Sequence, residues 1–128
     1  MIDENDRETW VGQNRFYLDE NNILFVKLIG KIDMETVTQL NLIYFKYINL
    51  VRGKLNCLVD LNDAGIQGTG TRKKGKEILD DERIGKVAFL GLHPVARVLA
   101  SFIIGTTSKK DLRFFKTKEE ALAWLKEE

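Results

Sequence analysis

The sequence predicts an α/β fold, in which a mixed, mainly parallel sheet of five strands is flanked by helices. The apolar segments follow the order strand, strand, helix, strand, helix, strand, helix, strand, helix, and repeated strand–helix units favour a parallel sheet. The run ILFVKLIGKI over residues 23–32 alternates only partly, which is typical of a strand covered on both faces. A chain of 128 residues is long enough for one such domain.

The first residues, 1–14, are polar and acidic, and they are predicted to form a flexible N-terminal arm. A single domain is predicted over residues 15–128, because no linker or repeat interrupts them. This domain opens with two strands, 15–20 and 23–32. The Asn21-Asn22 pair between them indicates a hairpin turn, since asparagine tolerates a positive φ.

Helix caps set the limits of several later elements. Asp33 stands where a first N-cap belongs, Gly53 marks the end of that helix, and Thr117 opens a capping box before the last helix. Pro94 occupies the favoured first position of another helix. The remaining elements are expected at strand 55–61, helix 71–82, strand 86–92, helix 94–105 and strand 112–115.

Composition places the protein among soluble globular domains. The net charge of +1 provides no overall attraction to nucleic acid or an anionic membrane. The single cysteine, Cys57, excludes a disulfide within the chain and suits a reducing compartment. No run of apolar residues approaches the ~20 needed to span a membrane, and no leader pattern opens the chain. We therefore expect a cytoplasmic protein that contacts neither nucleic acid nor the membrane interior.

The segment after the third expected strand is the main candidate for a binding site. Glycine-rich and basic, it joins the strand ending near Asp60 to a helix expected from about Thr71. Cations in the first turn of a helix face the positive end of its dipole, which costs about 0.3–1 kcal/mol each. A bound anion or phosphoryl group would relieve that cost. The predicted partner- or anion-binding residues are Gly68, Thr69, Gly70, Thr71, Arg72 and Lys73.

A purely structural explanation of these cations stays open. Lys73 with Glu77 and Lys76 with Asp80 are spaced to form ion pairs along one helix face, and such pairs would balance the charges without any ligand.

None of the catalytic motifs that the sequence resembles is complete. The segment GTRKKGK, residues 70–76, resembles a phosphate-binding loop, but Glu77 follows where a metal-binding hydroxyl is required. Asp60 ends a strand like a phospho-accepting aspartate, yet the preceding strand supplies no acidic pair for a metal. His93 and Cys57 have no partners for a zinc site or a nucleophile. We therefore expect no enzyme, no metal and no cofactor; an active site would otherwise use Asp60, Asp63 or His93.

The first and third helices carry more apolar surface than one buried face requires. Leu42 falls outside the buried stripe of its helix, and the segment VARVLASFII is apolar almost all round. This surplus is either covered by the fold itself, or part of a homodimer contact, or the wall of a pocket for a small apolar ligand. The residues predicted for such a surface are Phe45, Val98, Leu99 and Phe102.

Four segments resemble the SpoIIAA-like family, relatives of the STAS domains of anti-sigma-factor antagonists and of sulfate-transporter tails. These segments are LVDLNDAG, GTGTRKKGKEIL, KVAFLGLHPVARVLASF and LRFFKTKEEALAWL. The resemblance implies a small mixed sheet flanked by helices and no established enzyme activity. The family is also sometimes grouped with CRAL-TRIO lipid-transfer domains, which would suit the surplus apolar surface.

The resemblance also implies where a regulatory modification would lie. Anti-sigma-factor antagonists carry a phosphorylatable serine in a D-S-S-G loop at a helix start, and the matching stretch here is Gly68–Thr71, which contains no serine. Thr69 is the nearest positional match and Thr71 the second. The function expected is a non-catalytic regulatory domain that meets a protein partner or anion at this loop. The alternative is a carrier or sensor of a small, lipid-like ligand.

Overall fold

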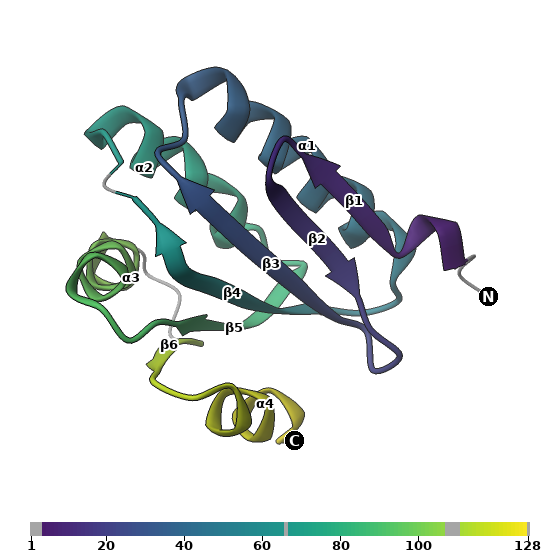
Figure 1. Ribbon diagram of the computed structural model, residues 1–128. Coiled ribbons are helices and arrows are strands. Elements are labelled where there is room, and N and C mark those ends of the chain that lie inside the picture. Colours follow the sequence, from purple (N-terminus) through teal and green to yellow (C-terminus); the bar gives the residue numbers. More distant parts are fainter. Residues whose placement is uncertain (1–3, 66, 107–110, 128) are drawn as a thin grey trace.

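A single six-stranded sheet forms the centre of the computed structural model, which describes residues 4–65, 67–106 and 111–127 (Figure 1). The strands follow one another across the sheet in chain order. The first three pair antiparallel, and the third to the sixth pair parallel. Their bounds are β1 Glu8–Val11, β2 Asn14–Leu18, β3 Ile23–Gly30, β4 Leu55–Ala64, β5 Ile84–Leu90 and β6 Leu112–Phe115.

Four α-helices cover the two faces of this sheet unequally. Their bounds are α1 Met34–Leu50, α2 Thr69–Glu77, α3 Pro94–Thr106 and α4 Lys118–Lys126, with short 3-10 turns η1 Glu4–Asp6 and η2 Ile78–Asp80. The larger core lies between one face of the sheet and residues of α1, η2 and α3. The smaller core lies on the other face, where only α4 packs. The predicted α/β class with a mainly parallel sheet is therefore confirmed.

Helix α1 shows how closely local sequence determines an element. The side chain of Asp33 caps it by accepting a hydrogen bond from Thr36 N at 2.7 Å. Gly53, just beyond the helix, has φ +75°, a conformation that glycine adopts without strain. Apolar residues at helical spacing predict a buried stripe of Val37, Leu40, Tyr44, Tyr47, Ile48 and Val51. The first five are buried against the sheet, whereas Val51 is the C-cap residue and is half-buried.

The strand count differs from the prediction of five because β1 lies within residues 1–14, which were expected to be a flexible arm. Strand β1 pairs with β2 across a turn at Gly12, whose φ is +60°. The Thr9 hydroxyl also lies 2.8 Å from the Tyr47 hydroxyl of α1, and this contact holds the strand against the helix layer. The prediction missed it because Trp10 and Val11 are the only large apolar residues of the strand itself.

Several other boundaries differ from the predictions: β2, β3 and β5 are Asn14–Leu18, Ile23–Gly30 and Ile84–Leu90 instead of 15–20, 23–32 and 86–92, and two further differences bear on the candidate site. Strand β4 continues to Ala64, so Asp60 lies inside the strand rather than at its end. Helix α2 begins at Thr69, two residues before the expected start at Thr71, and ends in η2, whose Ile78 and Leu79 are buried.

A buried glutamine joins the ends of β3 and β4. The Gln67 Oε1 atom accepts a hydrogen bond from Ile32 N at 2.6 Å, and Nε2 donates to the carbonyl oxygens of Gly30 and Gly65 at 2.9 and 3.0 Å. The Gly65 amide also donates to Gly30 O at 2.9 Å. A Cβ added at Gly65 would lie 3.1 Å from the Gly30 carbonyl carbon, so the two turns meet backbone to backbone.

Replacing this glutamine should therefore destabilise the fold. We expect Gln67→Ala to lower the free energy of unfolding by about 2–4 kcal/mol, because the buried Ile32 N–H loses its acceptor and the partly buried carbonyl groups of Gly30 and Gly65 each lose a donor. Urea unfolding followed by circular dichroism measures the change. Gln39→Ala, on the exposed side of α1, is the matched control and should stay within about 0.5 kcal/mol of the unaltered protein. Equal effects of the two substitutions would contradict this role of Gln67.

Candidate functional site

The N-terminal end of α2 lies at the edge of the sheet where the parallel strands end. The hydrogen bonds of Gly65 and Gln67 place it beside the turn from β3 to α1. In α/β folds of this kind, ligands bind at this edge because the loops that follow the strands meet there. The predicted site is thus at the edge of the sheet where strand-to-helix turns gather.

The first turn of α2 is open to solvent. Gly68 is its N-cap and has no side chain to cap the helix amides. Gly68, Thr69 and Gly70 are exposed, and the first turn contains no acidic residue. The first N–H groups of a helix have no partner within it, and they carry the positive end of its dipole. This end of α2 therefore offers hydrogen-bond donors to an anion.

The basic residues of α2 lie two residues further from the helix start than predicted. Since the helix starts at Thr69, Arg72 and Lys73 follow the first turn, and the predicted electrostatic cost of cations in that turn is wrong. Arg72 Nη2 donates to Thr69 Oγ1 at 3.3 Å. Lys74 pairs with Glu77 at 3.4 Å, whereas Lys73 had been expected to do so.

The other predicted pair is present, with Lys76 Nζ 3.1 Å from Asp80 Oδ2. Lys74 and Lys76 are therefore balanced along the helix. Lys73 is exposed, and no carboxylate lies within ion-pair distance of it among the residues that the structure describes.

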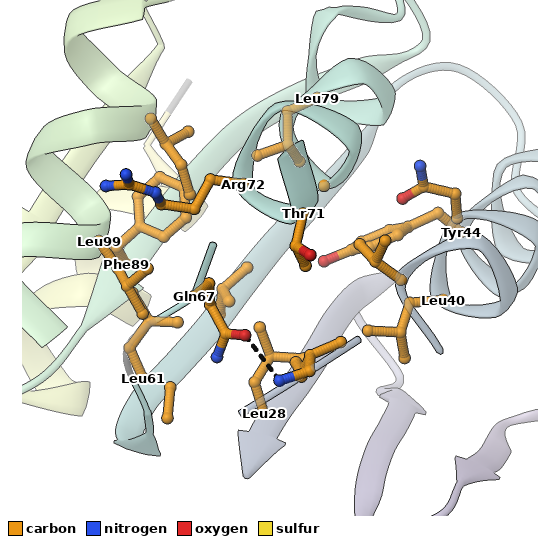
Figure 2. Close-up of a pocket in the computed structure, with 17 residues that line it drawn as sticks. Leu28, Leu40, Tyr44, Leu61, Gln67, Thr71, Arg72, Leu79, Phe89 and Leu99 are labelled. Atoms are coloured by element: carbon orange, nitrogen blue, oxygen red, sulfur yellow. Dashed lines mark hydrogen bonds between the residues drawn. The ribbon is translucent and has the colours of Figure 1, made fainter. Parts of the chain in front are cut away.

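The two threonines predicted as modification sites have different surroundings. Thr69 is exposed at the helix start, beside the guanidinium of Arg72. Thr71 lines a cavity beneath α2, and Figure 2 shows its side chain directed toward the hydroxyl of Tyr44. Only Thr69 presents its hydroxyl at the surface of this helix end.

The cavity lies between α1, α2, α3 and the sheet. Its volume is about 80 Å³, and its wall is mainly apolar, with Leu28, Leu61, Phe89 and Leu99 among the lining residues (Figure 2). Helix α2 has no buried residue, so it covers the cavity without filling it.

Polar groups of α1 also face this cavity. Asn41 Nδ2 donates to Lys74 O at 2.8 Å and so holds α2 against α1. Asn41 Oδ1 is buried and has no hydrogen-bond partner among the described residues. Burial raises the pKa of Tyr44 well above its ordinary value, because the charged phenolate would lie in an apolar setting.

The predicted apolar surface is not one surface. Leu99 lines the cavity, but Val98 is 59% exposed on α3. Phe45 is 39% exposed and lines a separate surface groove with Leu42 and Ile78. Helix α2 lies between α1 and α3 and keeps these residues apart (Figure 1). The side chain of Phe102 lies outside the described residues.

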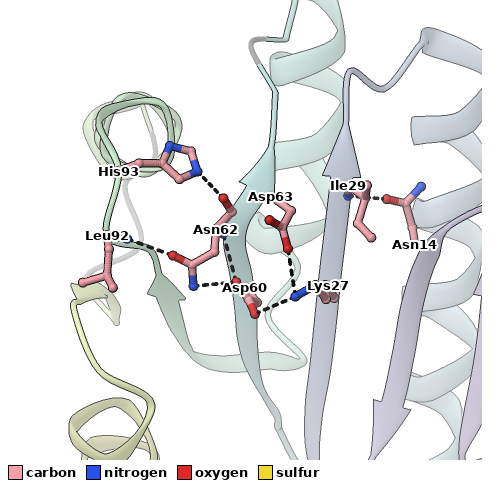
Figure 3. A network of polar contacts seen from close by, with 8 residues as sticks. All are labelled: Asn14, Lys27, Ile29, Asp60, Asn62, Asp63, Leu92 and His93. Carbon is pink, nitrogen blue, oxygen red and sulfur yellow. Dashed lines mark hydrogen bonds and ion pairs between the residues drawn. The ribbon is translucent and has the colours of Figure 1, made fainter.

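The polar residues at the end of β4 form a closed network (Figure 3). Lys27 Nζ lies 3.1 Å from Asp63 Oδ2 and 3.6 Å from Asp60 Oδ2, and these carboxylates raise the pKa of Lys27, with Asp63 contributing most. Asp60 Oδ1 accepts two hydrogen bonds from Asn62.

Asn62 links this network to the next strand-to-helix turn. Its Oδ1 accepts from Leu92 N at 2.9 Å, and its carbonyl contacts His93 Nε2. His93, which directly precedes α3, thus contacts the β4 backbone through its ring. An active site was expected to use Asp60, Asp63 or His93. These residues lie at the same end of the parallel strands, and the contacts of Asp60 and His93 join β4 to neighbouring segments.

In the part of the chain that the structure covers, no group of three or more His, Cys, Asp or Glu side chains could hold a metal ion. None of the described helices is long and apolar enough to cross a membrane.

Comparisons with known proteins agree with this architecture. A family model described as SpoIIAA-like matches residues 23–126. An uncharacterised protein from Shewanella loihica PV-4 with a SpoIIAA-like fold has a TM-score of 0.63 at 16% identity, over 92% of this chain and 90% of that one. An anti-sigma factor antagonist from Mycobacterium paratuberculosis has a TM-score of 0.63 at 18% identity, over 95% and 97%.

The unphosphorylated anti-sigma factor antagonist SpoIIAA has a TM-score of 0.53 at 14% identity, over 86% of this chain and 94% of that one. At such identities these likenesses show the fold alone. No curated protein sequence matches this one significantly.

The buried phenol of Tyr44 gives the cavity a pH-dependent signature. Its pKa is raised in the folded state, so above about pH 10 the unfolded chain loses this proton first. Stability should be unaffected by this group below about pH 10 and should fall as the pH rises further. Urea midpoints measured between about pH 9 and 11 should fall less steeply for Tyr44→Phe. If the urea midpoint falls equally steeply with pH in the two proteins, the raised pKa of Tyr44 is refuted.

Proposed function

Since the chain belongs to the SpoIIAA-like family, we propose that it acts as a non-catalytic regulatory domain, which binds a protein partner or an anion at the start of α2. The observation that carries this proposal is the exposed, uncapped N-terminus of α2 at Gly68–Thr71. Two of the structural neighbours are anti-sigma factor antagonists by name. Proteins of that kind act through another protein, which favours a partner over a substrate.

The binding chemistry follows from the helix end itself. The unpaired N–H groups of its first turn would donate hydrogen bonds to a carboxylate or phosphate oxygen. Arg72 and Lys73 add positive charge one turn away, and Glu77 lies at the far end of the helix, paired with Lys74. An acidic side chain or a phosphoryl group of a partner therefore matches this surface.

A phosphoryl group on Thr69 would occupy the same surface. Phosphorylation adds about −1.5 to −2 charges and three acceptor oxygens, and a helix N-terminus stabilises such a group. Arg72, which already contacts the Thr69 hydroxyl, would pair with it. Modification of Thr71 would instead place charge against the apolar cavity, so Thr69 is the better candidate.

Titration with inorganic phosphate tests this proposal. Amide NMR signals of Thr69, Gly70 and Thr71 should shift, and Lys73→Gln should weaken the affinity about two- to fivefold, because one nearby charge is lost. Gly68→Asp should abolish the response, since a carboxylate at the N-cap would accept hydrogen bonds from the same amides.

Lys126→Gln, on the exposed end of α4, is the matched control and should bind like the unaltered protein. Unmoved amides at millimolar phosphate, or equal losses for Lys73→Gln and Lys126→Gln, would overturn the proposal.

A second candidate function rests on the cavity. A mainly apolar cavity under a helix with no buried residue favours a sensor or carrier of a small apolar ligand. Its 80 Å³ is about half of the roughly 150 Å³ that holds benzene in another protein. A lipid tail would therefore require α2 to move outward.

Native mass spectrometry tests the carrier function on protein purified without detergent. We expect an additional bound mass, and Leu99→Phe should remove it because the larger side chain fills the cavity. Val98→Phe, on the exposed neighbouring position, should retain it. A bare mass for the unaltered protein, or equal behaviour of the two variants, would contradict a carrier function. Neither result bears on phosphate binding at α2.

A homodimer contact through the exposed side of α3 and a cytoplasmic location stay predictions.

A further inference from the structure

Among the residues that the structure describes, no helix covers one half of the second sheet face. The smaller core brings α4 against Ile23, Leu58, Ala88 and Leu90, which belong to β3, β4 and β5. The same face of β1 and β2 carries alternating side chains that are exposed or half-buried. This uncovered area lies on the opposite side of the sheet from the cavity and from α2.

Strand register arranges this face in two rows. Tyr17 pairs with Phe25, and Phe25 with Leu58, which gives an apolar row with two neighbouring aromatic rings. Arg15 pairs with Lys27, and Lys27 with Asp60, which gives a polar row beside it. These six residues, with Val26, Leu90 and Lys118, line a hollow of about 160 Å³.

Two of the charged groups in this hollow neutralise each other. Lys27 is held between Asp60 and Asp63, and the second oxygen of Asp60 accepts hydrogen bonds from Asn62 (Figure 3). These groups join β3 to β4, and with Asp63, which does not line the hollow, they carry one net negative charge.

The other two charged groups are cations that lie over the aromatic rings. Arg15 Cζ lies 5.1 Å from the centre of the Tyr17 ring, and Lys118 Nζ lies 5.1 Å from that of Phe25. Arg15 Nε also forms an exposed ion pair with Glu8 Oε2 at 2.5 Å. Lys118 has no carboxylate within ion-pair distance among the described residues, and it stands in the first turn of α4, where a cation is unfavourable.

We propose that this hollow binds a small aromatic anion. Its carboxylate would pair with Arg15 and Lys118, and its ring would lie against Tyr17 and Phe25. The two cations select a negative charge, and the two half-buried rings favour a flat apolar body over a bare ion. The volume is close to the roughly 150 Å³ of a cavity that holds benzene, so one substituted ring is the appropriate size.

Benzoate is the probe that tests this site, with acetate and benzyl alcohol as partial ligands. Benzoate should shift the amide NMR signals of Tyr17, Phe25 and Lys118. Acetate, which has no ring, and benzyl alcohol, which has no charge, should each bind at least about fivefold more weakly. Arg15→Gln and Lys118→Gln should each reduce benzoate affinity about fivefold. Lys126→Gln removes a lysine from the other end of the same helix, α4, and should bind benzoate like the unaltered protein.

Each opposite outcome would overturn the proposal in a recognisable way. Equal affinity for acetate would indicate a plain anion site, and equal affinity for benzyl alcohol would indicate an apolar hollow alone. No shift with benzoate would exclude the site. Circular dichroism of Arg15→Gln and Lys118→Gln identifies misfolding, and Phe25→Leu, which keeps the hollow apolar, should also weaken benzoate if the ring matters.

Discussion

The side-chain amide of Gln67 is the contact on which the candidate site depends. It joins the turn after β3 to the turn after β4 through one buried and two partly buried hydrogen bonds, where a side chain at Gly65 would crowd the Gly30 backbone. Helix α2 follows immediately, so the position of its exposed first turn is set by this contact. The contact therefore fixes where the glycine-rich first turn of α2 begins, and it holds the amides of that turn at the end of the parallel strands.

The same helix combines strong anchoring at its ends with weak packing in its middle. Gln67 precedes it, and buried Ile78 and Leu79 follow it in η2. Between them, Gly70 and Gly75 lie close to Met34 and Val37 of α1, and no residue of α2 itself is buried. The cavity beneath results from this composition, because short and charged side chains cannot fill the space between α1 and α3.

Periodic segments were predictable from the sequence, whereas features that depend on distant partners were not. The stripe of α1, its Asp33 cap and the Asn22 turn follow from local rules, and the family resemblance was confirmed. Strand β1 depends on pairing with β2 and on contact with Tyr47, which no local pattern reveals. The start of α2 shifted by two residues, because Thr69 and Gly70 carry no helix signal, and this moved every cation relative to the helix end. The Arg15–Tyr17 and Lys118–Phe25 contacts could not be predicted from the sequence, because they depend on the strand register and on the position of α4.

The weak middle of α2 has a consequence for the motions of the protein. Elements with few buried apolar contacts open at a lower free energy than the global unfolding transition. Helix α2 could therefore detach as a unit while the six strands remain paired, and its backbone would exchange hydrogen with solvent before that of β4 or β5. The protein would then possess a second, partly opened form, whose population a partner or a ligand at α2 could change without altering the rest of the fold.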